Sequence, residues 1–288
     1  VDALRPGGRL ILLGDKDQLA SIESGAVLSD FIKGLPGNSV TLRKSFRFDR
    51  NIKLLSESIN KEDYDAVWHQ LTVDDGNVSL LAEGELYLHL ARRYGDYLRF
   101  AQSAGEVTEE KILKIFAKFH EYQVLCGVAY GDRGVQRINS KIEQLLALEG
   151  LHCRQGDWYP GRPVLITQND YNLGLFNGDI GICLWDDAKK AYRVWFEGGN
   201  ANLKSCFVTL LPPHETVYAM TIHKSQGSEF AEVLVVLPRE DNRVLSRELI
   251  YTAVTRAKKS VRMSQILTRQ VWPRQRAARK TDRAAAWP

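Results

Sequence analysis

The chain alternates apolar strand patterns with amphipathic helix patterns, and this alternation constrains its fold most. Strand patterns are predicted at 9–13, 122–127, 233–237 and 260–264. Helix patterns are predicted at 27–33, 51–69, 86–101, 109–120, 135–146 and 244–258. Strands that alternate with helices fold most readily into a parallel sheet covered by helices on both faces. We therefore predict an α/β fold of this kind.

The stretch 161–211 departs from that alternation. Short β-type runs at 163–167, 180–185, 192–196 and 203–210 are separated by turn residues such as Asn177-Gly178-Asp179. About 50 residues of closely spaced strands inside an α/β chain predict a small inserted β-barrel.

Length and cysteine content narrow the class of protein. The 288 residues are enough for two domains or one large one. No apolar run approaches the roughly 20 residues that span a bilayer. The four cysteines, Cys126, Cys153, Cys183 and Cys206, show no CxxC pairing. This spacing argues against a zinc site or a disulfide framework and fits a reducing cytoplasm.

The charge of the chain is unevenly distributed. From Arg256 to the end there are ten Lys or Arg and one acid, whereas the remaining chain contains 29 basic and 34 acidic residues. The body therefore has no global attraction for nucleic acid, and phosphate contacts there would need local grooves. The tail, 265–288, either contacts phosphate or an acidic partner, or is a solvated end.

Polar clusters follow predicted strands or begin helices, where α/β proteins bind ligands. Asp15, directly after the first strand pattern, can hold Mg²⁺, and Gln18 can sense a γ-phosphate or orient a water. Arg47 lies between two aromatic residues, and Arg256 lies near the end of a predicted helix. Both arginines suit phosphate, although a surface position and a helix dipole also account for them. Asp15 and Gln18 can likewise belong to a turn with a helix cap.

The segment 219–230 gathers Thr, His, Lys, Ser, Gln and Glu just before an apolar run. It is either a phosphate-contacting segment or a solvated helix start. The sequence contains no GxxxxGK[ST] loop to hold β- and γ-phosphates. Either that loop lies upstream of residue 1, or the chain does not bind nucleotide.

In this order, the clusters GDKDQL (14–19), SFRF (45–48), TIHKSQGSEF (221–230) and YTAVTRAKK (251–259) resemble motifs III, IV, V and VI of superfamily 1 helicases. Segments 134–143 and 161–181, together with the HKSQG form of motif V, narrow the resemblance to the RecD family. RecD is the alpha subunit of exodeoxyribonuclease V (RecBCD). The resemblance extends to about residue 264.

That resemblance implies a 5′-to-3′ ATP-dependent DNA helicase that acts in double-strand break repair and recombination. Its motor has two RecA-like domains with ATP and Mg²⁺ between them. Residues 1–40 would end the first motor domain, 41–160 and 212–264 would form the second, and 161–211 would be an SH3-like barrel. The P-loop would lie upstream, so this chain alone is expected to be inactive. RecB, RecC and single- and double-stranded DNA are the implied partners.

The same resemblance assigns roles to individual residues. Those implied at the nucleotide are Gly14, Asp15, Gln18, Arg47, Gly227, Glu229 and Arg256, of which Gln18, Arg47 and Arg256 would be catalytic. Those implied at the DNA are Thr221, His223, Lys224 and Ser225.

Other functions fit parts of the sequence. A stand-alone RecD-like helicase or the helicase part of a relaxase would share these motifs. A non-catalytic DNA-binding or assembly module would keep the fold with degenerate motifs, yet the polar residues of all four clusters are present. A metal-dependent nuclease using Asp15 and Asp17 would need further carboxylates or histidines nearby, and the sequence shows none there.

Overall fold

A computed structural model describes residues 4–5, 7–19, 27–42, 49–73, 76–103, 105–198, 202–239 and 245–264. The predicted site residue Arg47 and the basic tail 265–288 lie outside the described residues. Within the part described, no helix is both long and apolar enough to cross a membrane.

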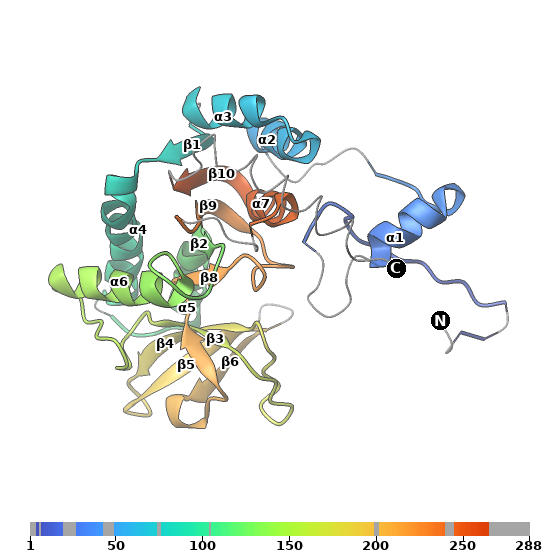
Figure 1. Cartoon of the computed structure of the whole chain (residues 1–288). Coiled ribbons are helices and arrows are strands. Elements are labelled where there is room, and N and C mark those ends of the chain that lie inside the picture. The colour runs from blue at the N-terminus through green and yellow to red at the C-terminus, as the bar shows by residue number, and fades with distance from the viewer. Residues whose placement is uncertain are drawn as a thin grey trace.

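The larger unit is built on a five-stranded, all-parallel sheet with the strand order β1-β10-β9-β2-β8 (Figure 1). Its strands are β1 (Val78–Leu81), β2 (Tyr122–Cys126), β8 (Ala219–Thr221), β9 (Phe230–Val236) and β10 (Ala257–Ser264). Every residue of β2 is buried, as expected for a strand covered on both faces.

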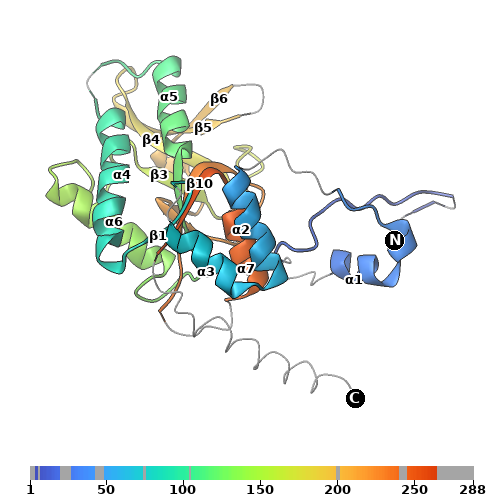
Figure 2. The same cartoon turned by 90° about the horizontal axis from the view of Figure 1, so that it is seen from above.

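Helices cover both faces of this sheet. One group consists of α2 (Arg50–Lys61), α3 (Tyr64–Val73) and α7 (Arg247–Val254), and the other of α4 (Leu86–Ala101), α5 (Glu109–His120) and α6 (Val135–Leu148). Figures 1 and 2 show the two groups on opposite sides of the strands. The predicted α/β architecture with a parallel sheet is confirmed.

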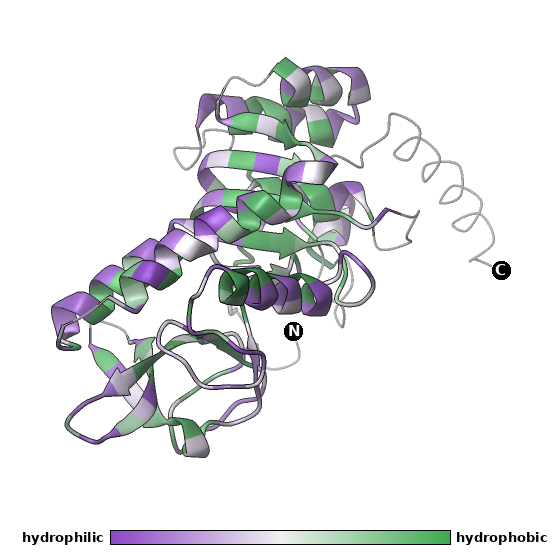
Figure 3. Ribbon diagram, turned by 90° about the vertical axis from the view of Figure 1, so that its left-hand side faces the viewer, coloured by the Kyte–Doolittle hydropathy of each residue, from purple (hydrophilic) through white to green (hydrophobic). Residues whose placement is uncertain are grey.

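Helix α5 shows why these helices form where the sequence predicts them. The Thr108 hydroxyl accepts a hydrogen bond from the Lys111 amide and caps the first turn. Four apolar side chains at helical spacing are all buried: Ile112, Ile115, Phe116 and Phe119. Figure 3 shows the same division throughout, with hydrophobic residues concentrated on the central strands and polar residues on the outer helix surfaces.

The second unit is a five-stranded antiparallel sheet with the order β6-β5-β4-β3-β7. Its strands are β3 (Pro163–Ile166), β4 (Ile180–Asp186), β5 (Ala191–Glu197), β6 (Leu203–Phe207) and β7 (His214–Thr216). The predicted strands are therefore present, but the sheet continues to Thr216, beyond the predicted boundary at 211. Strands β6 and β7 form its two edges and do not pair with each other among the described residues, so a closed barrel stays a prediction.

Buried contacts join the two sheets. Residues Val217 and Tyr218, which connect β7 to β8, are 0% exposed. The Tyr97 hydroxyl on α4 donates to the Gly161 carbonyl at 2.8 Å, just before β3. Because Gly161 has φ +87° and packs against α4, this junction requires glycine.

The segment 9–13 corrects one prediction: it is not a strand. Leu10, Ile11 and Leu13 are 54%, 79% and 92% exposed, and the segment pairs with no described strand. An apolar run becomes a strand only when a neighbouring strand binds its backbone. Nearby, α1 (Val27–Gly34) buries none of its residues and lies to one side of both sheets in Figures 1 and 2.

Smaller differences concern where elements end. The predicted helix 51–69 is two helices, because Glu62 adopts left-handed φ 58° and ends α2. The predicted strand 203–210 ends at Phe207, and Val208–Leu210 form a 3₁₀ turn, as do Pro36–Asn38 and Glu83–Glu85. The predicted helix 244–258 is shorter, since β10 already begins at Ala257.

Candidate functional site

The first and last polar clusters, predicted separately from the sequence, meet in the structure. Arg256 Nη2 donates a hydrogen bond to Gln18 Oε1 at 3.1 Å, although 238 positions separate the two residues. Beside this contact, the Tyr251 hydroxyl donates to Asp15 Oδ2 at 3.1 Å. The Leu19 amide donates to Thr252 Oγ1 at 2.8 Å. The segment 15–19 is therefore fixed against α7 and the residues after it.

Arg256 is buried and held in one orientation. Only 2% of its surface is exposed, and it lies between the end of α7 and the start of β10. Its Nε donates to the Thr252 carbonyl at 3.3 Å, and its Nη1 donates to the Ser228 carbonyl at 3.2 Å. The guanidinium thus contacts three segments of the chain at once, in a geometry that suits recognition of an anion.

The third cluster joins the same place. Gln226 Nε2 donates to the Leu19 carbonyl at 2.7 Å, so the turn after β8 contacts the segment 15–19 directly. Glu229, at the end of this turn, is paired with Lys258 at 2.8 Å. Three of the four predicted clusters are therefore neighbours. The fourth, around Arg47, lies outside the described residues.

The turn 222–227 is ordered by its own hydrogen bonds. Thr221 Oγ1 accepts from the Lys224 amide at 3.2 Å, and the Thr221 carbonyl accepts from the Ser225 amide at 3.2 Å. Gly227 has φ +87°, a conformation that strains other residues. The Ser225 hydroxyl donates inward to the Ile222 carbonyl at 2.7 Å, and the residue is fully buried. Ser225 therefore supports the turn from inside.

His223 and Lys224 lie on the outer side of this turn. His223 is partly exposed, and burial of its ring lowers its pKa below the ordinary value. A neutral imidazole can donate or accept a hydrogen bond but adds no charge. Lys224 is exposed, and its ammonium contacts Glu215 on β7 at 2.7 Å. Of the residues predicted to face DNA, Thr221, His223 and Lys224 are accessible and Ser225 is not.

The residues of this site fit the terminal phosphate of ATP and a Mg²⁺ ion to different degrees. Arg256 and Gln18 suit a terminal phosphate, because one is a fixed cation and the other an amide that donates and accepts. Asp15 accepts hydrogen bonds from the Asp17 amide at 3.0 Å, from Gln18 at 3.2 Å and from Tyr251. The described residues bring together no group of three His, Cys, Asp or Glu side chains that could hold a metal ion.

Gly14 precedes this carboxylate in exposed backbone, and Asp17 is paired with Lys16 at 3.0 Å. A nuclease centre built on Asp15 and Asp17 therefore has no further ligands among the residues described.

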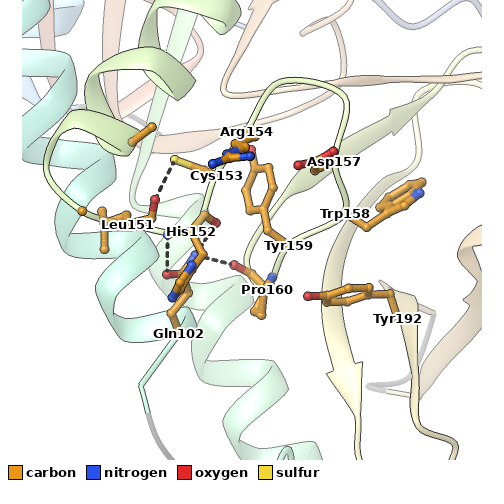
Figure 4. A pocket seen from close by; sticks show the side chains of 12 residues that line it. Gln102, Leu151, His152, Cys153, Arg154, Asp157, Trp158, Tyr159, Pro160 and Tyr192 are labelled. Carbon is orange, nitrogen blue, oxygen red and sulfur yellow. Dashed lines mark hydrogen bonds between the residues drawn. The ribbon is translucent and has the colours of Figure 1, made fainter.

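A separate pocket of about 700 Å³ lies where α4 and α6 meet the second sheet (Figure 4). In the wall of this pocket, Gln102 donates hydrogen bonds to the carbonyls of His152 and Pro160 at 2.8 and 3.2 Å. None of the predicted site residues lines this pocket.

Sequence analysis assigned no role to three residues that assemble the site, namely Tyr251, Thr252 and Gln226. All three lie inside the quoted clusters. Their polar side chains were visible in the sequence, but their partners at Asp15 and Leu19 lie more than 200 positions away. Only the fold identifies them.

Two protein-family models match parts of this chain. The family model for the UvrD-like helicase C-terminal domain matches residues 216–264, which include the turn after β8, α7 and Arg256. A model described as an AAA domain matches residues 1–81, which include Gln18. The two matches therefore cover both sides of the Gln18–Arg256 contact.

Individual relatives are more specific. The chain is 40% identical over 91% of its length to the RecBCD enzyme subunit RecD of Mycolicibacterium smegmatis, and covers 46% of that protein. It is 28% identical over 89% of its length to the ATP-dependent RecD2 DNA helicase of Deinococcus radiodurans, of which it covers 32%. The resemblance predicted from the motifs is confirmed: this chain is similar to RecD subunits. It spans about half the length of the curated RecD proteins it matches.

One solved structure, a Bacteroides Pif1 helicase in complex with ADP-AlF3 and ssDNA, overlaps 94% of this chain and 65% of its own. Its identity is 18% and its TM-score 0.44.

Proposed function

We propose that this chain is part of an ATP-dependent DNA helicase subunit of the exodeoxyribonuclease V type. The whole protein would move 5′ to 3′ along DNA, work with RecB- and RecC-like subunits in break repair and recombination, and reside in the cytoplasm. The 40% identity to a RecD subunit supports this reading over a stand-alone helicase, since the RecD2 relative is 28% identical.

The domain assignment is part of this proposal. Residues 41–160 and 212–264 would form a RecA-like motor domain, and 161–211 an SH3-like barrel inserted into it. The parallel sheet with helices on both faces supports the first, and the antiparallel sheet supports the second. Residues 1–40 would belong to the other motor domain. The exposed apolar side chains of Leu10 to Leu13 support this, because they would pack inside such a domain.

The Gln18–Arg256 contact is the observation on which the nucleotide site rests. It places an amide and a buried guanidinium from two sequence clusters within 3.1 Å of each other. Bound ATP would supply the γ-phosphoryl group, on which negative charge must be stabilised as it is transferred. Arg256 would then move its donors from Gln18 to phosphate oxygens, and Gln18 would orient the attacking water. Arg47 would add a second cation.

The turn 222–227 would connect this site to DNA. The turn contacts the segment 15–19 through Gln226, and it also exposes Lys224 and part of His223. A shift of the segment 15–19 on nucleotide binding would therefore move the residues that contact the DNA backbone. Thr221 would contribute backbone contacts from the same side.

The test is ATP turnover by the full-length protein with single-stranded DNA present. Arg256→Lys keeps the positive charge but loses the planar fork that reaches Gln18, Ser228 and Thr252. We expect turnover to fall by roughly 100-fold or more, since loss of an arginine finger typically costs 10³–10⁵. Arg99→Lys is the control, because Arg99 is an exposed arginine paired with Asp96 and Glu149.

Turnover of Arg256→Lys within a few fold of the control would refute the assignment. The 288 residues alone are expected to show no turnover, because no P-loop is present in their sequence.

A further inference from the structure

The contact between Lys224 and Glu215 joins the turn 222–227 to strand β7 of the second sheet. Lys224 Nζ lies 2.7 Å from Glu215 Oε1, and each side chain is 39% exposed. Among the residues described, neither side chain takes part in another ion pair. The charge of Lys224, which the family resemblance assigns to DNA, is therefore already neutralised by a carboxylate of the second sheet.

The backbone on both sides of this pair is held by hydrogen bonds and buried neighbours. Lys224 sits in a turn closed by hydrogen bonds to Thr221 and anchored by the buried residues Ile222 and Ser225. Glu215 lies in β7 and pairs with Leu165 of β3 in the antiparallel sheet. Only six residues separate Thr216 from His223, and the connecting residues Val217 and Tyr218 are completely buried. The carboxylate is thus held next to the ammonium by the fold.

We propose that Glu215 competes with a DNA phosphate for Lys224 and so sets the affinity of this turn for single-stranded DNA. A phosphate that binds Lys224 must displace the carboxylate, so part of the electrostatic gain is lost. The inference rests on the proposed DNA contact of the turn. It also makes the affinity depend on the second sheet, because any displacement of β7 away from the turn would release the ammonium.

The size of the effect follows from the exposure of the pair. An ion pair between exposed side chains contributes about 0.2–1 kcal/mol. Removal of the competing carboxylate should therefore raise the affinity for single-stranded DNA by roughly 1.5- to 5-fold at moderate salt. One additional phosphate contact adds roughly 0.7 to the slope of log affinity against log salt for single strands. The gain should shrink as salt is raised.

The experiment measures binding of a fluorescent oligo-dT strand to the full-length protein by anisotropy, over a series of salt concentrations. Glu215→Gln removes the charge and keeps the shape, and Glu215→Ala serves as a second substitution with the same expected sign. Glu197→Gln is the matched control. Glu197 lies in the same sheet, is similarly exposed and pairs with His120 at 2.9 Å. Because both substitutions replace a glutamate with glutamine, they change the net charge of the protein equally.

We expect both Glu215 variants to bind tighter than the wild type and Glu197→Gln to bind like it. In the background of Lys224→Ala, the Glu215→Gln change should give no gain, because the cation it frees is absent. Equal affinity of the Glu215 variants and Glu197→Gln would overturn the proposal, and so would a gain that persists without Lys224. If Lys224→Ala alone leaves affinity and salt slope unchanged, the proposed DNA contact of the turn fails as well.

Discussion

The burial of Arg256 predicts a large loss of stability when its side chain is removed. The residue is 2% exposed and donates to Thr252, Ser228 and Gln18 at 3.1 to 3.3 Å. A hydrogen bond from a charged group contributes about 1.5–3 kcal/mol, and a buried carbonyl left unpaired costs about 1–3 kcal/mol. The three bonds share one group and do not add fully. We expect Arg256→Ala to lower the free energy of unfolding by about 3–4 kcal/mol.

Urea unfolding of the full-length protein, followed by fluorescence and far-UV circular dichroism, measures this loss. Two variants calibrate it. Gln18→Ala removes one of the three acceptors and should cost about 1 kcal/mol. Arg99→Ala removes an exposed arginine that contacts Asp96 and Glu149, and should cost less than about 1 kcal/mol because surface ion pairs contribute little.

A cost for Arg256→Ala within about 1 kcal/mol of the Arg99→Ala cost would refute this reasoning. Such a result would mean that the guanidinium is solvated in solution and that the contact with Gln18 does not persist. Arg256 could then still act on a nucleotide, but its hydrogen bonds would not hold it in place before the nucleotide binds.

Two further changes test other parts of the structure. Burial and the neighbouring Arg262 lower the pKa of His89 from 6.5 to about 4, so the unfolded chain binds a proton before the folded one does. Stability should therefore be complete above pH 6.5 and decline as pH falls towards 4, and His89→Gln should lose less over that range in urea unfolding. At the sheet junction, a Cβ on Gly161 would lie 2.7 Å from both Ala101 Cβ and Leu98 Cδ1 in backbone with φ +87°. Gly161→Ala should cost roughly 2–4 kcal/mol in the same measurement.

Matched controls exist for both changes. His69 is exposed on α3, so His69→Gln should keep the wild-type decline between pH 6.5 and 4. Gly84 has open space where a Cβ would be and no left-handed backbone, so Gly84→Ala should leave stability nearly unchanged. A His89→Gln profile that matches the wild type, or a Gly161→Ala cost equal to that of Gly84→Ala, would contradict the respective prediction.

Elements with strong local patterns were predictable from the sequence. The apolar spacing of α4 and α5 gave both helices with their observed bounds. Strand β1 was missed because its four residues have no distinctive pattern, and its pairing with β10 makes it a strand. The segment 9–13 was predicted wrongly for the opposite reason, since its apolar residues lack a strand partner among the residues described.

The site divides in the same way. The sequence by itself determined the chemical groups: Gln18, Arg256 and the turn 222–227 stand out through residue type and local spacing, and local spacing also fixes which segments become helices. Only the tertiary structure decided that Arg256 reaches Gln18, that Ser225 points inward and that Glu215 forms an ion pair with Lys224. Local propensity depends on neighbours within a few residues, whereas these contacts join segments that the sheets bring together, and their energy exists only once the chain has folded.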